Sequence, residues 1–316
     1  SMANHFIDSV NGNNANTGHT MDAAWATVAY GLIGNLLSAA GDICWIRRNV
    51  QETLAATLTV AVNNQTSANP IRIIGWPRNT HAIVSSDWTN GSTAVVVDDA
   101  DMVHARHCGR YVTGPDSRTY MITRVVDASN IVINKEYVGS TVTNQAATIQ
   151  ADEDYALAQA IDDSAWTIKK ADWNADPDDI VDINCGGGAN YLSCLESYMY
   201  YANLRIGNST YGNGAVYPAN GGRNDLWQGC IFHNENNSNL FKSYETTMNF
   251  NRCLWIGSGA GSSQNGLDLE QGYSYPFSVR NSAIYNCGGS GLWAFAQSKV
   301  YLENVNIGVE QANLGY

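Results

Sequence analysis

Six segments in the C-terminal half of the chain share one pattern of apolar and polar residues. Each reads as an apolar residue, two mostly polar residues, a small or apolar residue, any residue and an apolar residue. The segments begin at Ile180, Tyr201, Trp227, Phe250, Val279 and Leu302. Successive segments begin 21, 26, 23, 29 and 23 residues apart. A repeat of about 20–50 residues is typical of solenoids, and one coil of a parallel β-helix has about this length.

A second set of apolar residues repeats with the same period. Short apolar strands start at or centre on Leu192, Val216, Leu240, Leu267 and Leu292, and the steps between them are 24, 24, 27 and 25 residues. Two apolar ladders with one period predict an all-β solenoid whose coils stack about 4.8 Å apart. Cys230 and Cys253 hold the same position in successive coils, so we expect them to stack inside as small apolar side chains.

The N-terminal segment resembles the opening of proteins of the pectate-lyase-like superfamily. The matching stretches are residues 6–12, 16–18, 22–27, 41–46 and 70–75. The resemblance implies a right-handed parallel β-helix that binds or cleaves polysaccharide. One helical face is expected to cap the open end of the solenoid. It comprises Trp25, Val28, Ala29, Leu32 and Leu36.

Residues 77–165 do not follow the repeat. They instead contain strands in which apolar and polar residues alternate. These strands are predicted at residues 94–97, 110–112, 120–126, 130–133 and 147–149. They predict a small inserted β-barrel or sandwich, which resembles modules of bacteriophage virion proteins. The β-helix is expected to resume near residues 166–168. The predicted organisation is an N-terminal cap with the first coils (1–76), the insertion (77–165) and the remaining coils (166–316).

Charge and hydropathy narrow the choice of partners. The formal net charge of −12 and the lack of a basic run argue against nucleic acid. No stretch approaches the roughly 20 apolar residues of a membrane span. The sequence also lacks the charged start of a signal peptide, so we expect synthesis in a host cytoplasm and incorporation into a virion. The last coil ends near Ile307 without a visible cap, which is compatible with a homotrimer.

Aromatic and acidic residues follow the apolar ladder on one lateral face. The residue after each apolar position should point outward. Together with the residues two further on, this places six candidates for carbohydrate binding: Tyr217, Phe241, Asp268, Glu270, Trp293 and Phe295. Aromatic rings stack on sugar C–H groups and carboxylates accept hydrogen bonds from hydroxyls. The alternatives are a trimer interface on the same face or strands covered by loops.

Asp268 and Glu270 are also candidates for a catalytic pair. Positions i and i+2 of a strand are roughly 6.5–7 Å apart, and inverting glycosidases separate their two carboxyl groups by about 6.5–9.5 Å. The alternative is a solvated acidic strand face. A lyase is less favoured, because Arg205, Arg252 and Arg280 occupy different coil positions and form no ladder with Asp268.

No metal or cofactor is predicted. The seven cysteines include no CxxC pair, which argues against a zinc site or a disulfide framework. The densest ligand-type cluster is Asp98, Asp99, Asp101, His104, His107 and Cys108, and it reads as a polar hairpin. The acidic runs 152–154 and 176–179 could bind Ca²⁺ but match no EF-hand loop and read as turns.

Three functions follow from these observations. The favoured one is a tailspike-like virion protein with a structural or host-glycan-binding role. The first alternative is a polysaccharide-degrading enzyme, a glycoside hydrolase before a lyase. The second alternative is a purely structural spacer, because fold alone does not fix function.

Overall fold

The chain forms a parallel β-solenoid of about nine turns in which only about 6% of residues are helical. The computed structural model describes residues 2–34, 36–98, 102–176, 179–218, 223–234, 236, 238–244, 247–258, 264–270, 276–294 and 299–308. The predicted fold class, an all-β parallel β-helix, is confirmed. None of the helices in the described ranges is long and apolar enough to cross a membrane.

Two walls of the solenoid belong to one continuous sheet. Its strands, in spatial order, are β1 (Asn4–Ile7), β2 (Ile43–Ile46), β5 (Ile71–Gly75), β14 (Met199–Ala202), β16 (Arg223–Gln228), β19 (Thr247–Asn251), β22 (Phe277–Tyr285), β20 (Leu254–Gly257), β17 (Ile231–Asn234), β15 (Leu204–Gly207), β12 (Val181–Asn184) and β3 (Gln51–Thr53). β24 (Val300–Gly308) pairs with β22 along both walls. All of these pairings are parallel, as stacked coils require.

The two walls meet at a bend that repeats in five successive coils of the C-terminal half. The bend residues all have positive φ values between 48° and 60°, and they are Asn203, Gly229, Arg252, Asn281 and Asn304. Glycine and asparagine tolerate this left-handed conformation best. The third position of the sequence repeat therefore marks a sharp turn of the backbone.

The register confirms five of the six repeat segments. Tyr201 pairs with Trp227, Trp227 with Phe250, Phe250 with Val279, and Val279 with Leu302. Cys230 and Cys253 lie inside the core and are fully buried, as predicted.

The prediction was wrong for the remaining segment, which begins at Ile180. Its actual pairing differs from the predicted pairing by two residues. Ile183 pairs with Ile206 rather than with Leu204. This coil differs from the others because its chain enters from a helical excursion and forms no equivalent of the bend before β12.

The third wall carries the second apolar ladder. It contains β4 (Leu58–Thr59), β13 (Leu192–Ser193), β18 (Phe241–Tyr244), β21 (Leu267–Glu270) and β23 (Leu292–Ala294), with Val216 bridging β13 and β18. Leu192, Val216, Leu267 and Leu292 occupy the predicted interior ladder. The third predicted position, Leu240, is wrong by one residue, because Phe241 and not Leu240 pairs with Leu267.

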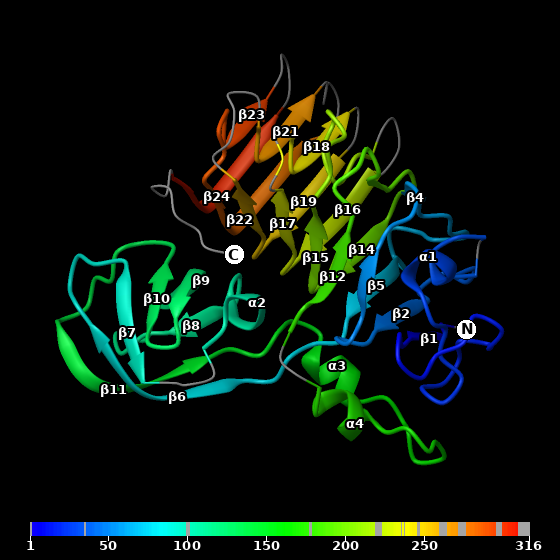
Figure 1. Ribbon diagram of the computed structural model, residues 1–316, viewed down its shortest axis with the longest axis horizontal. Coiled ribbons are helices and arrows are strands. Elements are labelled where there is room, and N and C mark those ends of the chain that lie inside the picture. Colours follow the sequence, from blue (N-terminus) through cyan, green and yellow to red (C-terminus); the bar gives the residue numbers. More distant parts are fainter. Residues whose placement is uncertain are drawn as a thin grey trace.

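A closed barrel lies beside the wall formed by β17, β20 and β22 (Figure 1). Its strands are β6 (His81–Trp88), β7 (Ala94–Asp98), β8 (Tyr111–Thr113), β9 (Thr119–Asp127), β10 (Asn130–Ile133) and β11 (Val142–Ile149). The helix α2 (His104–His107) packs on β9. The apolar core of the barrel continues onto the outer side chains of Ile231, Leu254 and Ile256, so the solenoid wall completes that core.

Two short helices cover the outside of β1, β2, β5 and β14. They are α3 (Tyr155–Gln159) and α4 (Lys170–Asn174), and Trp173 of α4 is fully buried against Trp76. The solenoid strand expected near residues 166–168 is absent. Trp166 instead packs edge-on against Phe6 from outside, with ring centroids 5.4 Å apart.

The predicted N-terminal helix is much shorter than expected. Only α1 (Val28–Gly31) is helical, and Val28 and Leu32 pack into the solenoid core. Glycine disfavours helix by about 1 kcal/mol relative to alanine, and Gly34 adopts a φ of 70°.

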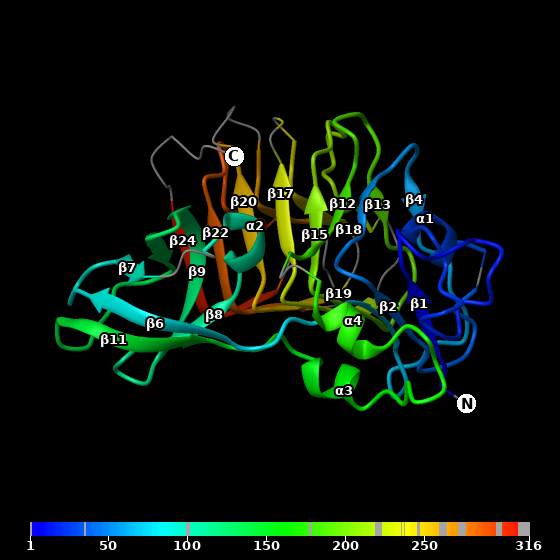
Figure 2. The ribbon, with the colours of Figure 1, turned by 60° about the horizontal axis from the view of Figure 1, so that its bottom comes forward.

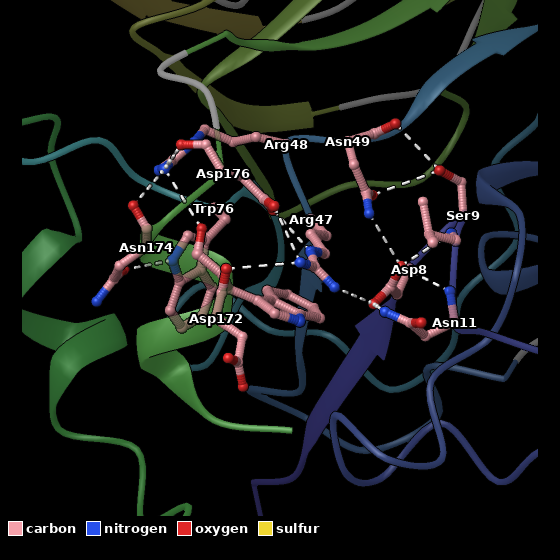
Figure 3. Close-up of polar contacts among 12 residues, drawn as sticks. Asp8, Ser9, Asn11, Arg47, Arg48, Asn49, Trp76, Asp172, Asn174 and Asp176 are labelled. Atoms are coloured by element: carbon pink, nitrogen blue, oxygen red, sulfur yellow. Dashed lines mark hydrogen bonds and ion pairs between the residues drawn. The ribbon is translucent and has the colours of Figure 1, made fainter. Parts of the chain in front are cut away.

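A buried polar network fastens the segment after α4 to the first coils (Figure 3). Arg47 lies between two carboxylates: its Nη1 is 2.7 Å from Asp8 Oδ2 and its Nε is 2.6 Å from Asp176 Oδ2. Arg48 donates to the backbone carbonyls of Pro77, Trp173, Asn174 and Asp176. We call Asp8, Arg47, Arg48 and Asp176 the anchoring network.

Candidate functional site

The wall built from β18, β21 and β23 lies on the opposite side of the solenoid from the barrel, α3 and α4 (Figures 1 and 2). Along each strand, alternate side chains point inward and outward. The pairing register aligns one outward row across successive coils, and its members are Ser193, Tyr217, Lys242, Asp268 and Trp293. Tyr244 and Glu270 form the next outward pair. We call Tyr217, Lys242, Asp268, Glu270 and Trp293 the lateral face.

Phe241, predicted to lie on this face, points into the core instead. It is fully buried and packs edge-on against Trp227, Phe232 and Phe250, with ring centroids 5.1–5.3 Å apart. The prediction was wrong because a one-residue slip in strand register exchanges the inner and outer sides.

Lys242 takes the outward position that was assigned to Phe241. Aligning residues 241–244, Phe-Lys-Ser-Tyr, with residues 267–270, Leu-Asp-Leu-Glu, would have shown this. Both stretches begin with a bulky apolar residue and then alternate between outward polar and inward small or apolar side chains. Phe295, the sixth candidate, lies outside the described residues.

Three tyrosines gather at one end of the lateral face. Tyr191 and Tyr211 stack with ring centroids 4.3 Å apart and planes 10° from parallel. Tyr217 meets both at a tilt, with centroid distances of 6.0 Å and 5.9 Å. Sequence reasoning identified Tyr217 and missed the other two, because they lie in connecting segments outside the strand pattern.

Trp293 lies at the other end of the lateral face. Its 37% exposure is the highest among the nine tryptophans, all of which the structure describes. Three strand spacings separate its row position from that of Tyr217, which amounts to roughly 14 Å. The lateral face therefore has an aromatic ring at each end.

Charged groups occupy the centre of the face. Lys242 Nζ is 2.9 Å from Glu270 Oε1 and 3.7 Å from Asp268 Oδ2. Asn239 Nδ2 donates to Asp268 Oδ2 at 2.9 Å. Asp268 Oδ1 is buried and makes no hydrogen bond with any residue in the described ranges, although the Asn265 side chain is close enough to favour the ionised carboxylate slightly.

The surroundings of Asp268 make its ionisation unfavourable. Burial raises the pKa of Asp268 to about 6, the Lys242 ammonium opposes this rise, and the Glu270 carboxylate adds to it. The pKa of Lys242 is affected in two directions. Burial lowers it, but the hydrogen bond to Glu270 and the charge of Asp268 outweigh burial and raise it.

The predicted catalytic pair shares one cation. Lys242 Nζ is 3.7 Å from Asp268 Oδ2 and 2.9 Å from Glu270 Oε1. These two contacts set an upper limit on the distance between the two carboxylate oxygens, which cannot exceed the two contact distances added together. That bound overlaps only the lower end of the roughly 6.5–9.5 Å range of inverting glycosidases. Asp268 is 2% exposed, so a substrate would reach it only after a side chain moves. The catalytic role of this pair stays a hypothesis.

The other candidate ligand clusters have ordinary structural partners. His107 is buried, and its Nδ1 lies 3.1 Å from the backbone nitrogen of Val103. Asp152 pairs with Arg78 at 2.7 Å, and Asp154 accepts from the hydroxyl of Tyr200 at 2.5 Å. Asp99 and Asp101 lie outside the described residues. Among the residues that the structure describes, no three potential ligands come close enough to hold a metal ion.

Comparisons with known proteins concern the fold alone. No protein-family profile matches the sequence, and no curated protein matches it. Among solved structures, the chain is similar to XylC in complex with xylose, with 10% identity and a TM-score of 0.35, covering 97% of this chain and 63% of that one. It is similar to pectate lyase Pel9A, with 11% identity and a TM-score of 0.33, covering 99% of this chain and 79% of that one.

A phage protein is also among the similar structures. The tailspike protein gp49 from Pseudomonas phage LKA1 has 10% identity and a TM-score of 0.24, and the match covers 86% of this chain and 52% of that one. The chain thus spans less than two thirds of the length of XylC and about half of the tailspike.

Proposed function

We propose that this chain is a glycan-binding β-solenoid and that the lateral face holds the glycan. The observation that carries the proposal is the arrangement of the face itself. A tyrosine cluster and an exposed tryptophan flank a buried centre of one lysine and two carboxylates. Elsewhere, the barrel packs on the wall formed by β17, β20 and β22, and α3 and α4 cover β1, β2, β5 and β14.

Each part of the face has a use in sugar recognition. Aromatic rings present flat apolar surfaces to the C–H groups of a sugar ring. Lys242 donates to hydroxyl oxygens, while Asp268 and Glu270 accept from hydroxyl protons. Charge-assisted hydrogen bonds of this kind are stronger than neutral ones. A bound hydroxyl would also supply Asp268 Oδ1 with the hydrogen bond that it lacks in the described structure.

The biological setting that we propose is a virion. Support comes from the resemblance of the inserted module to modules of bacteriophage virion proteins. Detection of the chain in purified phage particles, and not only in the soluble fraction of the infected host, would test this setting. A homotrimer is proposed on the resemblance of the β-helix to tailspike-like proteins, and the mass of the protein in solution would test it.

A second candidate function is glycoside hydrolysis with Asp268 as the general acid. The observation that favours it is the raised pKa of Asp268, about 6, beside a second carboxylate. A carboxyl group of this pKa is partly protonated at mildly acidic pH, as a general acid must be. Release of reducing ends that stops in Asp268→Asn, with glycan binding retained, would favour this function over binding alone.

The proposal is tested by titrating the protein with a panel of bacterial polysaccharides while tryptophan fluorescence is recorded. Binding at the lateral face should change the signal of the parent protein and leave little change in Trp293→Phe. Tyr217→Ala should weaken binding by roughly 3–10-fold, the loss of one aromatic contact. Tyr301→Ala removes another exposed aromatic residue on β24, away from this face, and serves as the matched control.

Two results would contradict the proposal. One is binding that Tyr217→Ala and Trp293→Phe leave unchanged in a calorimetric titration. The other is equal weakening by Tyr301→Ala, which would point to an unspecific effect of removing an exposed ring. If no polysaccharide of a broad panel binds, the spacer alternative is favoured.

A further inference from the structure

Two hollows lie along the repeated bend of the solenoid, and the barrel lines the smaller of them. One has a volume of about 480 Å³ and lies over Gln228, Asn251, Ser278, Arg280 and Asn281. The other has a volume of about 350 Å³ and lies between the barrel and the bend residues Arg252, Asn281 and Asn304. Both are lined by Asn281, and we call the two hollows together the bend groove.

The barrel is held in place along this groove by direct hydrogen bonds. Tyr285 Oη donates to the carbonyl of Asn134 at 2.9 Å, and Asn134 Nδ2 donates to Asn306 Oδ1 at 3.0 Å. The hydroxyl of Tyr111 donates to the carbonyl of Asn281. Figures 1 and 2 show the barrel beside β22 and β24. The groove is therefore a fixed feature of the junction between the barrel and the solenoid.

A chain of side-chain amides runs along the floor of the groove. Asn304 Nδ2 donates to Asn281 Oδ1 at 3.0 Å, and Asn281 Nδ2 donates to Asn251 Oδ1 at 2.9 Å. Asn251 Nδ2 then donates to Gln228 Oε1 at 3.0 Å. Every bond points the same way, and hydrogen bonds in such a chain polarise one another.

The chain ends at a donor without an acceptor. Gln228 is 5% exposed and lines the larger hollow, and its Nε2 has no hydrogen-bond partner among the residues that the structure describes. A buried amide donor left without an acceptor is energetically unfavourable. This atom is itself buried, and Gln228 also lines a small cavity beside Arg110 and Asp152. The amides that a ligand in the hollows can contact are those of Asn251, Asn281 and Asn304, which are half-buried or exposed.

The smaller hollow is positively charged although the whole chain carries a net charge of −12. Arg118, Lys135 and Arg252 line it, and its described lining contains no carboxylate. Arg252 lies over the ring of Tyr111 at 4.7 Å, and its Nη1 pairs with Glu153 at 3.1 Å from outside this hollow. Three cations facing one space repel each other, so an anion bound between them gains from all three.

We propose that the bend groove binds an acidic saccharide chain. A carboxylate of the saccharide lies among Arg118, Lys135 and Arg252, and its hydroxyls extend over the side-chain amides of the groove. Amide side chains both donate and accept, which suits sugar hydroxyls, and guanidinium groups bind carboxylates in a bidentate manner. This site is separate from the lateral face and stands whether or not that face binds glycan.

The test is calorimetric titration of the full chain with an oligosaccharide of glucuronic acid residues and with cellotetraose, its neutral counterpart. The acidic probe should bind at least 10-fold more tightly than the neutral one. Its affinity should fall as NaCl rises from about 50 to about 500 mM, because salt screens the exposed cations. The double variant Arg118→Gln/Lys135→Gln should weaken binding of the acidic probe at least 10-fold.

Two further variants separate this site from the alternatives. Asn281→Gly removes an amide that lines both hollows, at a positive φ that glycine tolerates, and it should weaken binding of both probes by roughly 5-fold. Lys169→Gln, at the start of α4 and outside both proposed sites, should leave the binding of the acidic probe unchanged. The inference is overturned if the acidic probe does not bind at millimolar concentration. It is equally overturned if Lys169→Gln abolishes binding while Arg118→Gln/Lys135→Gln does not.

Discussion

The anchoring network and the lateral face both place one cation between two carboxylates, with opposite results. Arg47 contacts Asp8 and Asp176 at 2.6–2.9 Å, and the hydrogen bonds that Asp8 accepts outweigh its burial and lower its pKa. Lys242 contacts Glu270 at 2.9 Å but Asp268 only at 3.7 Å, and burial raises the pKa of Asp268. The anchoring network thus stabilises the ionised form of its buried aspartate, Asp8, whereas the lateral face does not stabilise the ionised form of Asp268.

The difference lies in the number and geometry of donors. Arginine offers five N–H groups in a planar fork, whereas lysine offers one compact ammonium. Asp8 also accepts from the backbone nitrogen atoms of Val10 and Asn11 and from the Asn49 amide. Asp268 accepts one clear hydrogen bond, from Asn239. A buried charge that its own fold satisfies holds structure together, and one left incomplete is available to a ligand.

The strongest test of the comparison is to remove the cation from the satisfied cluster. Arg47→Met should lower the free energy of unfolding by roughly 3–5 kcal/mol, because it leaves Asp8 and Asp176 buried without their cation. Arg280→Met removes an exposed arginine paired with Glu303 and should change stability by about 0.5 kcal/mol at most. Urea denaturation of both variants checks this. Equally small losses of stability in the two variants would contradict the role given to the anchoring network.

The next test uses pH, because the two aspartates should act with opposite sign. The folded pKa of Asp8 lies below its unfolded value, so its contribution is present above about pH 4 and is lost as pH falls through the folded pKa. The folded pKa of Asp268 lies above its unfolded value, so stability should decrease as pH rises from about 4 to about 6.

Substituting each aspartate with asparagine measures these contributions at neutral pH. Asp268→Asn should stabilise the protein by on the order of 1–2 kcal/mol at pH 7 and remove the decrease between about pH 4 and about pH 6. Asp8→Asn should destabilise it at pH 7. Thermal unfolding across this pH range reports both, and destabilisation by Asp268→Asn at pH 7 would show that its ionised form is well satisfied.

A smaller effect is expected from removing the cation of the lateral face. In Lys242→Met, the only ammonium that opposes the raised pKa of Asp268 is lost, and the Glu270 carboxylate remains. The pKa of Asp268 should therefore rise above the value of about 6 in the parent protein. NMR titration of the side-chain carboxyl carbons measures it. An unchanged or lower pKa would mean that Lys242 is not the controlling charge.

The smallest expected effect concerns the rim of the lateral face. Tyr217→Ala should change the free energy of unfolding by about 1 kcal/mol or less, because Tyr217 is only half-buried. Phe241→Ala, one strand away but facing inward, should cost roughly 3–5 kcal/mol. Urea denaturation compares the two. A large loss in Tyr217→Ala would show that the tyrosine cluster serves packing before binding.

The fold was predictable because every coil repeats one register. The positions of Tyr201, Trp227 and Phe250 in the sequence are enough to align three coils, since each side chain stacks on its counterpart. The prediction failed where a local feature replaced the repeat. The chain between 150 and 176 forms two helices that pack outside the solenoid, and the glycines after Val28 shorten the expected N-terminal helix.

The sites were only partly predictable, for a physical reason. Tyr217 and Trp293 could be placed because they follow the apolar ladder, but Lys242 was hidden by a one-residue slip at Leu240. The bend groove could not be predicted from the sequence. Arg118 and Lys135 meet Arg252 only because the barrel docks on the solenoid, and no local pattern encodes a contact between residues more than 100 positions apart.

The most direct test of the account is the pKa of Asp268 measured with and without a glycan that binds the parent protein. Hydroxyl groups that donate to its carboxylate favour the ionised form. The account predicts that glycan binding lowers the pKa of Asp268 from about 6 toward the ordinary range of aspartate. A glycan that binds tightly while this pKa stays unchanged would contradict the lateral face as the binding site.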